Sequence, residues 1–400
     1  MKRRHFLKNS ALASSALMVP SFLKAFGGHS AGASRTGKIL IIVQLSGGND
    51  GLNTIVPYRN DLYYKYRPSL ALGKEEVLRV SDDLGLHPAM TGLRELYDEG
   101  LLSIVNSVGY PNPNRSHFRS MDIWQTGSGS KENWTTGWIG RFLDNHCSGC
   151  EEAHYALEID DSLSLAMKGY ERSGFAMSKP MQLRKTTEVP FLKTLGEQYQ
   201  NSADHSVDYL YKTMIDTQSS AQYLYQKSKV HRAKGNYPNT AFGNDVKLIA
   251  ELITADADTQ IYYVSLSGFD THINQKAQQQ RLLKQYAQAM KALISDLKAH
   301  NLLEDTLIMT FSEFGRRVKQ NGSRGTDHGT ANNLFLMGGA LQQAGFYNDA
   351  PDLRYLDNGD LRYQIDFRNI YATIIEEWLE ADARSILAGS FDRLALLNAR

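Results

Sequence analysis

Three short clusters of polar residues follow apolar, strand-like runs in this chain, and a fourth lies just before such a run. The clusters are residues 46–50 (SGGND), 268–272 (GFDTH), 312–316 (SEFGR) and 325–329 (GTDHG). In an open α/β sheet, parallel strands end at one edge, and that edge is where the ligand crevice lies. Asp, Glu and His are ligands of divalent metal ions. The pattern predicts a metal-dependent hydrolytic site, although polar residues also end strands without any further role.

The candidate metal ligands are the carboxylate and imidazole side chains of these clusters. If the chain is extended at Asp270 and His272, the i and i+2 side chains point to one side and reach one ion. The dipeptide Asp327-His328 can supply two metal ligands, or one ligand and the residue that orients that ligand. The full candidate set is Asp50, Asp270, His272, Glu313, Asp327 and His328.

Each candidate also has a purely structural interpretation. Asp50 lies in a glycine-rich turn and could cap the next helix together with Asn53. The pair Asp-x-His could form a hydrogen-bonded turn. Glu313 could form a salt bridge to Arg316 or Arg317, which lie within one turn of it.

The segment 109–127 (GYPNPNRSHFRSMDIWQTG) is rich in Pro and Asn and then resembles the start of a helix. Ser116 stands at that start beside Arg115 and His117, where exposed amides and a guanidinium favour an anion. Ser116 is therefore the candidate nucleophile, and Arg115 or Arg316 would neutralise charge in the transition state. The alternative is that Ser116 is a helix N-cap. The two roles are compatible.

Apolar runs alternate with helical patterns from about residue 38, which predicts an α/β fold with a mostly parallel sheet and helices on both faces. Residues from about 185 to 240 are more polar and predict a helical insertion or cap. Asp366 is well placed to cap the last predicted helix. The predicted strands are 38–45, 101–108, 154–159, 261–267, 305–311 and 333–339, and the predicted helices are 88–100, 279–300 and 366–379.

The composition limits the classes of partner. The chain has 400 residues, 44 Lys and Arg, 43 Asp and Glu, and a formal net charge of +1. This balance gives no electrostatic reason to expect a nucleic acid as partner. The two cysteines, Cys147 and Cys150, lie in CSGC between helical and acidic segments, which favours a small loop disulfide over a redox pair.

The N-terminus resembles a twin-arginine export signal. Arg3 and Arg4 precede Phe6, Leu7 and Lys8, a modest apolar stretch follows, and small residues then offer cleavage positions. We therefore expect residues 1–34 to be a signal peptide and the protein to reach the periplasm or the exterior through the twin-arginine translocation machinery. Beyond this signal no run of 18 or more apolar residues occurs, so we expect no stable membrane span.

Nine segments of the chain together resemble the bacterial 1501 family of domains of unknown function, from about residue 38 to 380. They include LSGGNDGLNTIVPY, GYPNPNRSHFRSMDIWQTG, GFDTH, SEFGRR and NGSRGTDHGT. This family is distantly similar to the alkaline phosphatase and sulfatase superfamily. The resemblance implies a single alkaline-phosphatase-like α/β domain over residues 35–400 that uses one or two divalent ions such as Zn, Mn or Ca.

Residues of this chain match the superfamily pattern at most of its positions. Superfamily members have an Asp-His dipeptide at the position where this chain has Ser312-Glu313. In a site with two metal ions, this difference removes ligands of the second ion. A formylglycine sulfatase is disfavoured because Pro111 occupies its nucleophile position before Pro113-Asn114-Arg115. The matching residues are Asp50 after the first strand, Ser116 at a helix start, the pair Asp270 and His272, and the last histidine, His328.

The sequence therefore predicts an exported metal-dependent hydrolase or transferase that acts on an anionic phosphate or sulfate ester. Two alternatives stay open. One is a non-catalytic exported protein of the same fold with at most a structural ion. The other is an accessory protein that binds carbohydrate or polymer through the tyrosine-rich insertion.

Overall fold

The first strand shows why the sheet is buried on both faces. Strand β1 (Ile39–Ser46) is apolar at almost every position, and every residue but the last is buried. Successive side chains point to opposite faces. Ile39, Ile41 and Val43 accordingly pack into one hydrophobic core, while Leu40 and Ile42 pack into a second. A strand of this kind needs cover on both sides.

The computed structural model describes residues 37–146, 153–187 and 205–398, so the predicted signal and both cysteines lie outside the described residues.

Nine strands form the large sheet, and three short strands form a second, antiparallel one. In spatial order the large sheet contains β11 (Gly345–Phe346), β5 (Leu102–Gly109), β10 (Asn332–Met337), β9 (Thr306–Phe311), β1, β8 (Ile261–Ser267), β6 (Ala156–Glu158) and β7 (Phe175–Ala176), with β12 (Ile365–Asp366) also paired to β5. The small sheet contains β2 (Ile55–Val56), β4 (Gly85–Leu86) and β3 (Leu78–Arg79).

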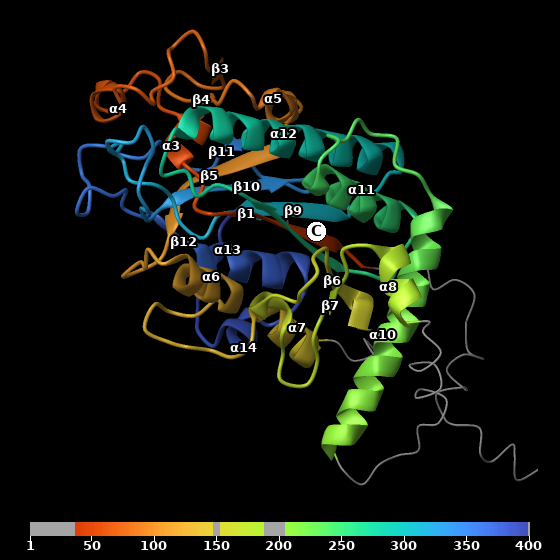
Figure 1. Cartoon of the computed structure of the whole chain (residues 1–400). Helices are drawn as coiled ribbons and strands as arrows, with labels where there is room; N and C mark the ends of the chain where they lie inside the picture. The colour runs from red at the N-terminus through yellow and green to blue at the C-terminus, as the bar shows by residue number, and fades with distance from the viewer. Residues whose placement is uncertain (1–36, 147–152, 188–204, 399–400) are drawn as a thin grey trace, which may run out of the picture. The chain divides into compact units, whose positions relative to one another are not determined.

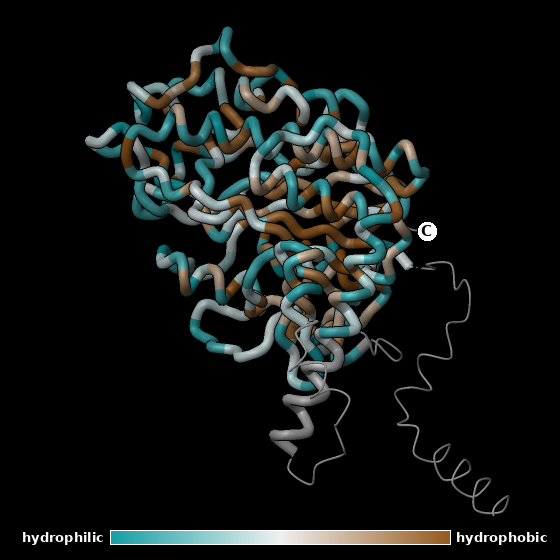
Figure 2. The backbone as a smooth tube through the Cα atoms, turned by 45° about the vertical axis from the view of Figure 1, so that its right-hand side comes forward, coloured by the Kyte–Doolittle hydropathy of each residue, from teal (hydrophilic) through white to brown (hydrophobic). Residues whose placement is uncertain are grey.

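Helices cover the two faces of the large sheet (Figure 1). The first core includes residues of α5 (Thr91–Asp98), α11 (Ala241–Thr254) and α12 (Gln275–Ala299). The second includes residues of α6 (His117–Thr126), α7 (Trp138–His146), α13 (Phe367–Thr373) and α14 (Ala383–Leu387). The most hydrophobic segments of the tube lie in the strands between these layers (Figure 2). The remaining elements are α3 (Gly51–Thr54), α4 (Asp61–Tyr66), α8 (Pro180–Thr187), α10 (His205–Val230), the 3-10 turns η1 (Ala153–Tyr155) and η2 (Leu165–Met167), and the π-helical turn η3 (Ile374–Trp378).

The strand directions bring the polar clusters to one edge of the sheet. Strands β8 and β9 both pair with β1 in parallel, so the three strands end together. Strand β10 is antiparallel to both β9 and β5. It therefore begins at the edge where β9 and β5 end. The segments that follow β1, β5, β8 and β9, and the segment before β10, all lie at this edge.

The predicted α/β class is confirmed, as are all six predicted strands. One detail of the sheet differs from the parallel pattern. A parallel connection needs a crossover, usually through a helix. Between β9 and β10 the chain forms no helix and turns back at the same edge instead, so β10 runs antiparallel.

Several predicted helix features are present in the structure. Asp366 caps α13 by accepting a hydrogen bond from the backbone N–H of Arg368. In the region from about 185 to 240, α8 ends at Thr187 and α10 covers His205–Val230, whereas residues 188–204 lie outside the described residues. Within the described ranges, no helix combines the length and apolar character needed to cross a membrane.

Candidate metal centre

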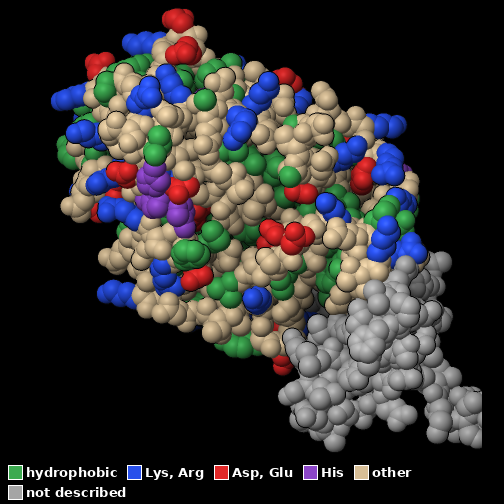
Figure 3. Space-filling model, viewed as in Figure 1, with side chains coloured by type: hydrophobic (Ala, Val, Ile, Leu, Met, Phe, Trp, Pro, Cys, Tyr) green, Lys and Arg blue, Asp and Glu red, His purple; other side chains and the backbone are tan. Residues whose placement is uncertain are grey.

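Three histidine rings converge on one carboxylate oxygen at the sheet edge. The Oδ1 atom of Asp270 lies 3.0 Å from Nε2 of His272, 3.1 Å from Nε2 of His328 and 3.5 Å from Nε2 of His117. The Nε2 atoms of His272 and His328 are themselves 3.0 Å apart. Histidine side chains gather at one place on the molecular surface, with acidic side chains beside them (Figure 3).

The second nitrogen of each ring is held by an oxygen acceptor. The Nδ1 atoms lie 2.9 Å from Glu313 Oε1 for His117, 3.3 Å from Asp327 Oδ1 for His272, and 2.8 Å from the Arg115 carbonyl for His328. A carboxylate or carbonyl oxygen only accepts, so each Nδ1 must donate its proton. In the neutral ring this leaves a lone pair on Nε2. In that state the three Nε2 atoms present lone pairs toward the same Asp270 oxygen.

This donor set fits a divalent cation. Metal-bound histidines donate their other ring nitrogen to a carboxylate or a backbone carbonyl, which is the arrangement found at all three rings. Ligand atoms of His117, Asp270 and His328 lie within 4.8 Å of one another. Imidazole nitrogens with one carboxylate oxygen are typical ligands of Zn²⁺.

The electrostatics around Asp270 keep its carboxylate ionised. Burial raises its pKa, but the hydrogen bond from Arg316 and the neighbouring His328 ring outweigh burial and bring the pKa to about 2. Burial lowers the pKa of His328. The hydrogen bond to Glu313 raises the pKa of His117. Asp270 therefore carries a negative charge at neutral pH, which favours a cation among the three rings.

His117 is the residue of this cluster that sequence reasoning did not single out as a candidate ligand. It is the first residue of α6, and its ring contacts those of His328 and Phe314 with centroid distances of 4.3 Å and 4.8 Å. Its sequence neighbourhood shows no pair such as Asp-x-His. The signal that could have found it is a histidine in the polar segment that follows a predicted strand, β5.

Glu313 is fully buried and acts on His117. Its Oε1 atom accepts hydrogen bonds from the backbone N–H of Gly47 and from His117 Nδ1, both at 2.9 Å. The alternative salt bridge is wrong, because Arg316 pairs with Asp270 and Arg317 with Asp360. The structure thus places Glu313 behind a candidate ligand, with its carboxylate accepting from Nδ1 of His117.

Asp327 holds a similar place behind His272. Its Oδ1 atom accepts from Nδ1 of His272 and from the side-chain amide of Asn321 at 3.1 Å. Asp327 and Glu313 therefore occupy corresponding positions, each fixing the orientation of one ring. Both were expected among the ligands, and both contact a ring nitrogen that faces away from the convergence point.

Asp50 is engaged elsewhere. Its carboxylate forms a buried ion pair with Arg67 at 2.5 Å and also accepts from the Gln275 side chain. It is the N-cap residue of α3, although its side chain makes no capping hydrogen bond. The structure does not bring Asp50 together with the three rings, because the positive charge of Arg67 already compensates its negative charge.

Arg316 is buried rather than directed at a substrate. Its guanidinium donates to the carbonyls of Gly47, Gly48, Phe269 and Thr326, and to Asp270 Oδ1 at 2.7 Å. These carbonyls belong to three separate polar clusters. The structure therefore gives Arg316 a positioning role that differs from the expected neutralisation of a transition state.

Arg115 and Ser116 lie at the exposed side of the site. The Arg115 guanidinium pairs with the buried carboxylate of Asp360. Ser116 is exposed and is the N-cap residue of α6, but its side chain makes no capping hydrogen bond. Its backbone N–H donates instead to the Asn114 side chain at 2.8 Å. Ser116 therefore stands at the N-cap position, as expected, but its hydroxyl does not cap the helix.

Two glycines allow the turn after β1 to approach the site closely. Gly47 has a φ of +114°, and a Cβ there would lie 2.5 Å from the backbone nitrogen of Asp270. Gly48 has a φ of +73°, and a Cβ there would lie 2.2 Å from the Phe314 ring. Side chains at these positions would have to displace Asp270 or Phe314.

Comparison with known proteins gives a family and a set of distant structural relatives. Residues 37–397 match the family described as protein of unknown function (DUF1501). No curated protein matches the sequence of the chain.

Among solved structures, the zinc complex of the C-terminal periplasmic domain of EcEptC from Escherichia coli matches with a TM-score of 0.37 and 11% identity, over 76% of this chain and 72% of that one. The lipoteichoic acid synthase LtaP from Listeria monocytogenes matches with 0.36 and 10%, over 78% and 68%. The PsFucS1 sulfatase from Pseudoalteromonas sp. matches with 0.37 and 10%, over 80% and 66%. At these TM-scores, the chemistry of this chain has to be argued from its own side chains.

We expect Gly47→Ala to destabilise the protein and to disturb the metal centre together. The strained backbone alone costs about 1–3 kcal/mol in the free energy of unfolding, and the new Cβ would displace Asp270. The matched control is Gly322→Ala, where a Cβ meets nothing within 4 Å. Chemical unfolding and metal analysis of both variants test this. Equal stability of the two variants would contradict the tight approach at Gly47.

We expect His117→Ala, His272→Ala and His328→Ala each to lower the bound metal, because each removes one converging nitrogen. Glu313→Gln should weaken metal affinity by roughly 10–100-fold, since it removes the acceptor that orients His117. Elemental analysis of protein purified with added Zn²⁺ measures this, with exposed His300→Ala as the control. Unchanged metal content in His117→Ala would exclude His117 from the ligand set.

Proposed function

We propose that this chain, which belongs to the family of proteins of unknown function (DUF1501), is an exported metal-dependent hydrolase or transferase that acts on a phosphate or sulfate ester. The observation that carries the proposal is the convergence of three Nε2 atoms on Asp270 while each Nδ1 is held by an acceptor. This geometry changes the set of metal ligands expected from the sequence, because it adds His117 and moves Glu313, Asp327 and Asp50 out of the set.

The residues that would hold a divalent ion are His117, Asp270, His272 and His328. Glu313 and Asp327 would orient two of these rings rather than bind the ion themselves. Nitrogen-rich coordination favours Zn²⁺ over Mn²⁺ or Ca²⁺, since the last prefers oxygen ligands. A bound divalent ion would supply Lewis-acid chemistry by polarising an ester oxygen and promoting ionisation of a nucleophile.

Accessibility of the ligands favours a catalytic over a structural ion. Structural zinc sites are closed, whereas catalytic ones keep a position open to substrate. The side chains of His117, His272, His328 and Asp270 remain 27%, 39%, 23% and 49% exposed. This partial exposure supports hydrolysis over the alternative of a non-catalytic protein with an ion as a structural staple.

The chain's own groups assign two further roles. The exposed hydroxyl of Ser116 lies next to His117 in sequence and is not used for capping, so it is the nucleophile that we propose. The guanidinium of Arg115 is held by Asp360 and remains half exposed, so it can contact an anionic ester. Arg316 acts through Asp270, whose position and charge it fixes.

The alternative function, an accessory protein that binds carbohydrate or polymer through the tyrosine-rich insertion, has less support. Part of that region, residues 188–204, lies outside the described residues. Within α10, the tyrosines at 223 and 225 contact neighbouring side chains, namely His154 and Arg184. These contacts are those of a helix packed onto the domain.

We expect Ser116→Ala to lower kcat for 4-nitrophenyl phosphate or 4-nitrophenyl sulfate by several orders of magnitude if the hydroxyl attacks the ester. Metal content and stability should stay close to those of the parent, because the side chain makes no capping bond. The exposed Ser295→Ala on α12 is the control. Full turnover by Ser116→Ala would transfer the role of nucleophile to water.

We also propose export by the twin-arginine route, on the sequence of the N-terminus. Replacing Arg3 and Arg4 by Lys should leave the precursor uncleaved in the cytoplasm, because this route depends on the paired arginines. Cell fractionation and the N-terminal sequence of the mature protein measure the outcome. A double variant that is still exported and cleaved would contradict this route.

A further inference from the structure

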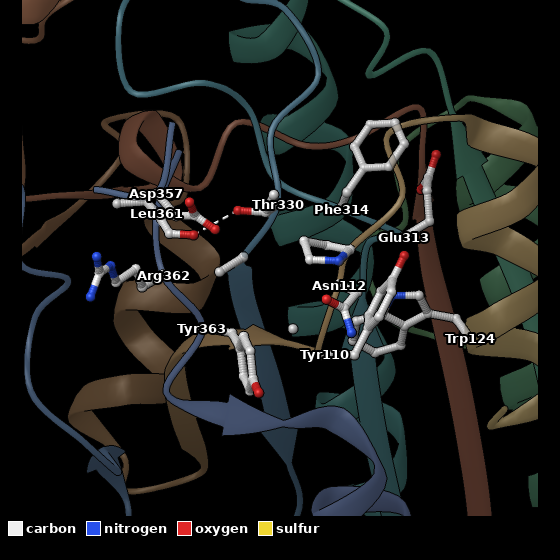
Figure 4. A pocket seen from close by; sticks show the side chains of 13 residues that line it. Tyr110, Asn112, Trp124, Glu313, Phe314, Thr330, Asp357, Leu361, Arg362 and Tyr363 are labelled. Carbon is white, nitrogen blue, oxygen red and sulfur yellow. Dashed lines mark hydrogen bonds between the residues drawn. The ribbon is translucent and has the colours of Figure 1, made fainter. Parts of the chain in front are cut away.

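A cavity of about 470 Å³ lies beside the metal centre. Its wall is built from the end of β5, the segment that follows it, α6, the turn after β9, the segment before β10 and the loop 357–363. Tyr363 stands on one side of this space, with Tyr110 and Trp124 on the other (Figure 4). The volume falls in the range of small-molecule sites, about 300–1,000 Å³. It is larger than an inorganic phosphate or sulfate group requires.

The cavity and the metal centre share two residues. Glu313 and Phe314 line the cavity. Glu313 also binds His117, and the Phe314 ring lies 4.8 Å from the rings of both His117 and His328, measured between centroids. A molecule in the cavity would therefore lie directly against the groups that we propose to bind the ion.

Aromatic side chains form much of the wall. The Trp124 ring is already stacked on both Phe311 and Phe367, with centroid distances of 4.8 Å and 4.3 Å. Trp124 can thus offer only its edge, which is held rigidly. The Tyr110 hydroxyl is fixed by Ser120 at 3.0 Å. Tyr363 is 39% exposed and can cover a ligand that enters.

The charges of the wall do not suit an anion. Its ionisable side chains are the carboxylates of Glu313 and Asp357 and the guanidinium of Arg362, so positive charge is not in excess. Arg362 extends away from the aromatic side chains (Figure 4). An ester's anionic group would bind at the metal centre instead, and the cavity would receive the uncharged remainder.

We infer that the cavity binds a sugar ring, the hydroxyl-bearing part of the ester whose anionic group lies at the metal centre. The ring of Tyr363 can pack on a C–H face of such a sugar, while the Asn112 amide, the Asp357 carboxylate and the Tyr363 hydroxyl offer hydrogen bonds at its edges. This mixture of polar and aromatic groups disfavours an aliphatic chain. The inference rests on the proposed function for the link between ring and ester.

Binding can be tested separately from turnover. Metal-stripped protein is mixed with uncharged methyl glycosides of glucose, galactose, mannose and N-acetylglucosamine, and saturation-transfer NMR reports contact. We expect transfer to at least one glycoside. Tyr363→Ala should weaken this binding by roughly tenfold, and Tyr363→Phe should retain most of it, because the ring face provides the contact. Tyr355→Ala is the control, since Tyr355 is 66% exposed and lies outside the wall.

Turnover of sulfate and phosphate esters of the glycoside that binds then completes the test. Tyr363→Ala should raise KM for the sugar ester about tenfold while leaving kcat and metal content unchanged, whereas Tyr355→Ala should leave KM unchanged as well. Absence of glycoside binding by the parent protein, or equal binding by Tyr363→Ala, would overturn the sugar pocket. Glycoside binding without turnover of any ester would instead refute the proposed hydrolase and leave the pocket in place.

Discussion

The guanidinium of Arg316 is buried, and a buried positive charge is costly unless hydrogen bonds and a negative partner compensate it. Here the partners are carbonyls from the segments that follow β1 and β8 and from the segment before β10, together with Asp270. One side chain thus fixes the relative positions of three chain segments far apart in sequence. The short loops around the site can hold the histidine rings in place because their backbones converge on this cation.

Charge at the sheet edge is distributed so that most carboxylates are neutralised individually. Asp50 is paired with Arg67, and Asp360 with Arg115 and Arg317. Glu313 is committed to His117 and to a backbone amide. Asp270 differs, because it is half exposed and faces three ring nitrogens in addition to Arg316. Carboxylates of the first kind are already compensated by a cation or an amide, whereas the arrangement at Asp270 leaves ring nitrogens directed at one oxygen. The proposed chemistry follows from that contrast.

At the same edge of the sheet, two neighbouring sites differ in the chemical groups that they can bind. The candidate metal centre offers imidazole and carboxylate atoms, while the adjoining cavity offers aromatic rings and little net charge. Phe314 separates them and contacts rings of the metal centre. It is held against the turn after β1 because Gly48 has no side chain to displace it. A substrate with an anionic end and an uncharged, hydroxylated ring would satisfy both environments at once.

The sequence alone determined the α/β class, the strands of the central sheet and the edge at which the polar clusters lie, because apolar periodicity and strand ends are local properties of the chain. It also singled out Asp270, His272 and His328, which the fold brings together. The tertiary structure decided the rest. His117 joins these residues because β10 pairs between β9 and β5, which places α6 beside the turn after β9, and strand order is not a local property. Asp50 and Arg316 were expected at the reacting centre, but their surroundings are set by Arg67 and by carbonyls from distant segments. Whether a charged side chain binds a ligand or holds the fold depends on which partners the packing brings to it.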